Sequence, residues 1–81
     1  MEIQKRSSYW ILLDGVEKLG VFTTPQNFNG IIWFQVKRTA VSRMNRNWEL
    51  VEKFPFGGSG YAGTYELTLE QFERFFGLDL G

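Results

Sequence analysis

The chain has 81 residues, a formal net charge of zero and an aromatic content of 17%. It lacks cysteine and histidine, which excludes disulfides, thiolate metal sites, thiol nucleophiles and histidine-based catalysis. A chain of this length buries only about 60–65% of the surface that it exposes when unfolded, so its core must use large side chains. We therefore expect a single domain over residues 1–81, without a metal or a cofactor.

The first half of the chain is predicted to contain three strands. Residues 9–13 are rich in aromatic and β-branched side chains, Asp14-Gly15 is a turn dipeptide, and residues 19–23 complete a hairpin. Residues 24–30 contain a proline, two asparagines and a final glycine, which predicts a loop. Residues 31–38 have the clearest strand pattern in the chain.

The second half is predicted to contain two more strands. Residues 39–47 are polar and basic, which indicates a loop or one loose helical turn. Residues 48–54 form the fourth strand, the glycine-rich residues 55–60 form a flexible turn, and residues 61–67 alternate as a fifth strand. No apolar run approaches the ~20 residues that cross a bilayer, and the N-terminus has no hydrophobic signal core, so we expect a cytoplasmic protein.

The pattern changes to a helical period after the last strand. Thr68 and Gln71 have the spacing of a capping box, and Gly77 is typical of a helix end. The sequence therefore predicts an α+β fold, in which a curved antiparallel sheet of four or five strands carries one C-terminal helix on one face. A small closed β-barrel with a C-terminal helix is the alternative.

The two faces of the predicted sheet differ in what covers them. On the face under the helix, Phe72 should pack against Phe34, Leu50 and Leu67.

The other face is left uncovered by so short a helix, and aromatic side chains are predicted on it. Trp33, Phe22 and one of Trp10 or Ile11 should lie there. Such a face closes into a barrel, pairs with a second copy in a homodimer, or binds a ligand.

No arrangement of residues in the sequence is typical of an enzyme. The GGSG segment at residues 57–60 lacks the lysine of a phosphate-binding loop, and Glu49 and Glu52 alternate to opposite faces of a strand. The serines have no base to activate them. We therefore expect a non-catalytic protein.

Charge is segregated along the chain. Residues 18–48 contain five basic residues and no acidic ones, whereas residues 49–81 contain six acidic residues against Lys53 and Arg74. Aromatic and cationic side chains on one surface are typical of proteins that bind single-stranded nucleic acid, because bases stack on the rings and cations contact the phosphates. The candidate nucleic-acid-binding residues are Trp33, Gln35, Lys37, Arg38, Arg43 and Arg46.

Residues 47–77, NWELVEKFPFGGSGYAGTYELTLEQFERFFG, resemble the last strands and helix of the PUR/Whirly-type ββββα family of single-strand nucleic-acid-binding transcription factors. The resemblance implies a curved antiparallel sheet followed by a capped helix. It also implies dimerisation and binding of single strands across the sheet, which would place Trp33, Gln35 and Lys37 on the binding surface.

A protein-interaction or inhibitor module, of the kind encoded by phages and mobile elements, is the alternative function. The acidic residues Glu66, Glu70 and Glu73 could then mimic a nucleic-acid backbone towards a basic partner protein, or the aromatic sheet face could bind that partner. The two hypotheses differ in which charged region makes the contact.

Overall fold

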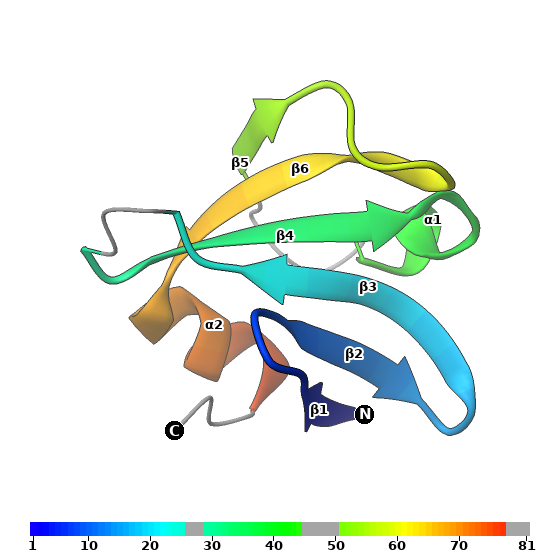
Figure 1. Ribbon diagram of the computed structural model, residues 1–81, viewed down its shortest axis with the longest axis horizontal. Helices are drawn as coiled ribbons and strands as arrows, with labels where there is room; N and C mark the ends of the chain where they lie inside the picture. The colour runs from blue at the N-terminus through cyan, green and yellow to red at the C-terminus, as the bar shows by residue number, and fades with distance from the viewer. Residues whose placement is uncertain (26–28, 45–50, 78–81) are drawn as a thin grey trace.

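The computed structural model describes residues 1–25, 29–44 and 51–77. Within them, six strands form one antiparallel sheet, and three helical segments complete the fold (Figure 1). The strands are β1 (Glu2–Lys5), β2 (Trp10–Asp14), β3 (Glu17–Thr23), β4 (Ile31–Lys37), β5 (Val51–Phe54) and β6 (Tyr61–Thr68). The helices are the 3₁₀ turn η1 (Arg38–Ala40), α1 (Val41–Met44) and α2 (Leu69–Phe76).

The strands lie in the order β1-β2-β3-β4-β6-β5, and every pair is antiparallel. The sheet is open, because β1 and β5 each pair with one neighbour only. The α+β fold with a C-terminal helix is therefore confirmed, and the closed barrel is not formed. The sheet has one strand more than the sequence predicts, because β1 (EIQK) contains a single apolar residue and has no strand-like alternation.

The hydrophobic core lies on the face of the sheet that α2 covers. Phe72 of α2 is completely buried and packs in one cluster with Phe34 and Leu67, as predicted. Leu50, the remaining predicted contact of Phe72, lies outside the described residues. The capping box is also confirmed: Gln71 N donates to Thr68 Oγ1 over 3.0 Å, and Thr68 N donates to Gln71 Oε1 over 2.8 Å.

Phe22 belongs to this core, so its predicted place on the uncovered face is wrong. Its ring stacks on Phe34 with centroids 4.4 Å apart and meets Phe72 edge-on at 4.7 Å. The register explains the difference, because Phe22 lies directly opposite both Trp10 and Phe34, and directly opposite residues point to the same face. Of Trp10 and Ile11, Ile11 is therefore the residue that points to the other face.

The segment after β4 covers the other end of the core. The sequence predicts a loop or a loose helical turn over residues 39–47, and the described part forms η1 followed by the single turn α1, whereas residues 45–47 lie outside the described residues. Ala40 is buried in the core cluster and Val41 packs against it. In Figure 1, α2 and α1 lie near opposite ends of the sheet. No helix among the described residues is long and apolar enough to span a membrane.

Candidate nucleic-acid interface

The face of β4 and β6 that points away from α2 contains an open hollow of about 320 Å³. Trp33 and Gln35 are two residues apart on β4 and both point to this side of the sheet. Thr64 of β6 lies directly opposite Gln35. The segment between β5 and β6 supplies the remaining wall. The lining residues are Trp33, Gln35, Phe54, Phe56, Gly57, Gly58 and Thr64.

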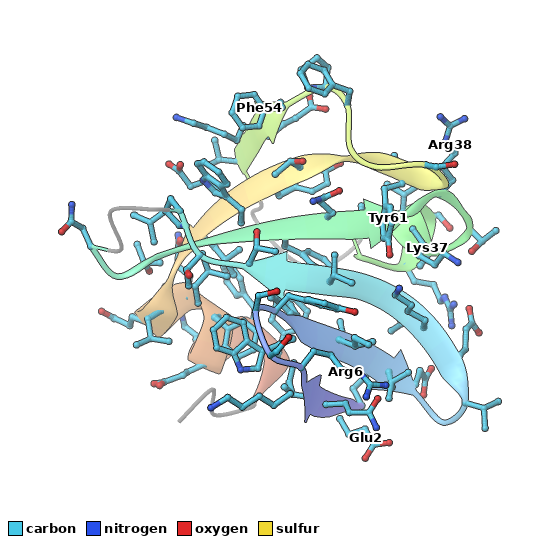
Figure 2. The ribbon with its side chains drawn as sticks, in the orientation of Figure 1. Glu2, Arg6, Lys37, Arg38, Phe54 and Tyr61 are labelled. Atoms are coloured by element: carbon cyan, nitrogen blue, oxygen red, sulfur yellow. The ribbon has the colours of Figure 1, made fainter. Side chains whose placement is uncertain are left out.

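Three aromatic rings form one side of the hollow. Trp33 and Phe54 meet edge-on with centroids 5.7 Å apart, and Phe54 stacks on Phe56 at 5.8 Å. Phe56 is 68% exposed, which leaves most of its ring open to a ligand. Figure 2 shows Phe54 on β5, at the edge of the sheet. We call Trp33, Phe54 and Phe56 the aromatic wall.

Two side chains on the sheet hold the β5–β6 loop in place. Gly58 N donates to Gln35 Oε1 over 2.8 Å, and Thr64 Oγ1 donates to the carbonyl oxygen of Phe56 over 3.1 Å. The loop lies so close to the sheet that a Cβ on Gly57 would come within 3.0 Å of Tyr61 Cβ and 3.1 Å of Gln35 Oε1. Glycine at this position therefore permits the loop to lie close to the sheet, where it forms one wall of the hollow.

Lysine side chains lie further along the same face. Lys37 is directly opposite Tyr61, and the two are adjacent in Figure 2 at the end of β4. Lys18 Nζ lies 5.7 Å from the centroid of the Tyr61 ring, a cation–π distance. Neither lysine forms an ion pair with an acidic residue in the described part of the chain. We call Lys18, Lys37 and Tyr61 the basic end of the face.

The three predicted arginines differ from these lysines in their surroundings. Arg38 begins η1 with an exposed side chain, and its backbone N donates to Gly60 O over 3.1 Å. Arg43 is bound by two acidic residues of the β2–β3 hairpin: it forms an ion pair with Glu17, and its Nη1 lies 3.6 Å from Asp14 Oδ2. Arg46 lies outside the described residues. The structure therefore brings together Trp33, Gln35 and Lys37, and pairs Arg43 with acids.

The three acidic residues of the alternative hypothesis are divided between the two faces of the sheet. Glu66 lies directly opposite Trp33 on the open face, and its Oε2 is 3.6 Å from Lys53 Nζ. Glu70 and Glu73 lie on α2 with exposed side chains, on the other side of the sheet. They do not form one acidic surface with Glu66.

Several residues of this face were not predicted, because β-bulges move them from one side of the sheet to the other. Simple alternation places Phe54 and Tyr61 on the core face. The register shifts between Glu52 and Phe54 and between Val36 and Lys37, so both rings reach the open face. The glycines at residues 57–58 indicate a close backbone approach, but they do not identify what is approached.

No protein-family model, curated protein or solved structure matches this chain. The resemblance to the PUR/Whirly-type family and the homodimer that it implies therefore remain predictions. The site is a hollow with an aromatic wall, beside two lysines on the same sheet face.

Proposed function

We propose that this chain is a non-catalytic, single-stranded nucleic-acid-binding protein that uses the open face of β4 and β6. The observation that carries the proposal is the combination of the aromatic wall with Lys18 and Lys37 on one face, where neither lysine forms an ion pair with an acidic residue that the structure describes. Stacking of a base on an aromatic ring stabilises such complexes by about 1–3 kcal/mol per base, and the cations contact the phosphates.

The spacing of the two parts fits a short stretch of single strand. Trp33 and Lys37 are four residues apart on β4, which corresponds to roughly 13 Å at the rise of an extended strand. This distance matches a few nucleotides at the ~3.4 Å spacing of stacked bases. A base has to leave its duplex to enter the hollow, so we expect single strands to bind more tightly than duplexes.

A titration of a fluorescently labelled oligothymidylate, followed by anisotropy at two salt concentrations, tests the proposal. Trp33→Ala should weaken binding by about 1–3 kcal/mol and leave the salt dependence nearly unchanged, because stacking involves no counterion release. Val16→Ser is the control, since Val16 is fully exposed at the tip of the β2–β3 hairpin, outside the lining of the hollow. If the wild-type protein does not bind at low salt, the proposal is wrong.

A protein-interaction role is a second candidate, and the exposed apolar side chains of the sheet edge favour it. Val51 is 66% exposed on the edge strand β5, and Phe56, in the loop that follows this strand, is 68% exposed. An unprotected edge strand with apolar side chains can pair with a strand of another protein. In that case Val51→Lys should abolish capture of the partner, whereas it should strengthen nucleic-acid binding slightly because it adds a cation.

A further inference from the structure

We infer that the hollow selects pyrimidines with a carbonyl oxygen at position 4, thymine and uracil, over cytosine, and that Gln35 is the residue that makes this selection. The inference rests on the proposed function and specifies its substrate. It depends on which hydrogen-bonding groups remain available inside the hollow.

The orientation of the Gln35 amide is set by the loop above it. Gly58 N lies 2.8 Å from the Gln35 amide, and a backbone N–H can only donate. The atom that faces Gly58 must therefore be Oε1, and the NH₂ group points elsewhere. Gln35 Nε2 has no hydrogen-bond partner in the part of the chain that the structure describes. It offers two donors to a ligand.

The other polar side chains of the lining already use their hydrogens. Trp33 Nε1 donates to Glu66 Oε2 over 3.1 Å, and Thr64 Oγ1 donates to Phe56 O over 3.1 Å. Among the side chains that line the hollow, the free donors are thus those of the Gln35 amide. A base held against the aromatic wall would meet this NH₂ group with one of its edges.

The NH₂ group favours a carbonyl over an amino group on that edge. Thymine and uracil carry a carbonyl oxygen at position 4, where cytosine carries an amino group that only donates. Two donors facing each other leave both unsatisfied. One hydrogen bond of ordinary strength corresponds to roughly a three- to tenfold difference in affinity.

The first measurement compares labelled oligothymidylate, oligodeoxyuridylate and oligocytidylate of equal length with the wild-type protein. These pyrimidines are of similar size, which reduces differences in stacking, and the uracil oligonucleotide removes the contribution of the thymine methyl group. We expect the thymine and uracil oligonucleotides to bind roughly three- to tenfold more tightly than the cytosine one. Equal affinities would overturn the inference.

The second measurement uses Gln35→Glu, which keeps an oxygen for Gly58 N and replaces the NH₂ group by an acceptor. The preference for thymine over cytosine should disappear or reverse. Gln4→Glu is the matched control, because Gln4 lies in the same cross-strand row on β1 and its Oε1 also accepts a hydrogen bond, from Arg6 Nη2 over 2.8 Å. It adds the same charge and should keep the wild-type ratio.

The outcomes separate this inference from the proposed function. If all three oligonucleotides bind equally and Trp33→Ala weakens each of them, the protein binds single strands and the selection by Gln35 is refuted. A Gln35→Glu protein that melts like the wild type and keeps the wild-type ratio also refutes it. If no oligonucleotide binds at low salt, the proposed function fails, and the inference fails with it.

Discussion

Trp33 donates its indole N–H to Glu66 Oε2 across β4 and β6, with 3.1 Å between the two heavy atoms. The same carboxylate oxygen lies 3.6 Å from Lys53 Nζ. The residue that is the first candidate for base stacking is therefore tied to a residue first considered for an acidic protein-binding surface. Glu66 orients the indole, and it also places a negative charge at the edge of the hollow and neutralises Lys53.

Glu66→Gln should strengthen single-strand binding, because it removes a charge that repels phosphate and keeps an oxygen for Trp33 Nε1. If the released Lys53 contacts one phosphate, the salt dependence of log K should become steeper by about 0.7. The measurement is an anisotropy titration at several salt concentrations. Glu70→Gln is the matched control, since Glu70 lies on α2 on the other side of the sheet. Weaker binding by Glu66→Gln would contradict the prediction.

Lys37 and Arg43 should behave differently when each is replaced by alanine, although both belong to the basic segment of the sequence. Lys37→Ala should make the slope of log K against log salt concentration shallower by about 0.7, as expected for one lost phosphate contact on a single strand. Arg43→Ala should leave it unchanged, because Asp14 and Glu17 already neutralise the guanidinium. These ion pairs are exposed, so their loss should cost at most about 1 kcal/mol of stability.

The same series of salt titrations checks this pair of variants, with thermal melts to show that each is folded. Equal effects of the two substitutions would mean that Arg43 leaves its acidic partners in the complex. A Lys37→Ala variant with the wild-type salt dependence would contradict the assignment of the basic end to the binding face.

Phe72→Ala should cost about 3–5 kcal/mol, because it opens a cavity in the centre of the core where Phe72 contacts Phe22 and Phe76. This is a large part of the roughly 5–15 kcal/mol that stabilises a typical domain. Urea unfolding measures the loss. Phe75→Ala is the matched control on the same helix, since Phe75 is only partly buried and is not part of the core cluster. A similar loss for both variants would contradict the assignment of the helical face.

The sequence by itself was sufficient for the features that depend on a few neighbouring residues. The α2 helix follows from Thr68 with Gln71 and from Gly77, which has the left-handed conformation with φ of 63° that favours glycine. The β2–β3 hairpin follows from Asp14-Gly15, and the alternation along β4 correctly puts Phe34 in the core and Trp33 with Gln35 on the other face. These signals are local, so tertiary packing did not override them.

Only the tertiary structure decided how the faces of different strands combine. Bulges lie at Leu19 on β3, opposite Leu12 and Leu13, at Ala62 on β6, opposite Val36 and Lys37, and at Lys53 on β5. A shift of one residue moves every following side chain to the opposite face, and the composition of a strand does not reveal where such a shift occurs. For this reason Phe22 is in the core and Phe54 is in the aromatic wall. The sequence also does not predict the pairing of Arg43 with Asp14 and Glu17, because only the folded chain brings α1 next to the β2–β3 hairpin.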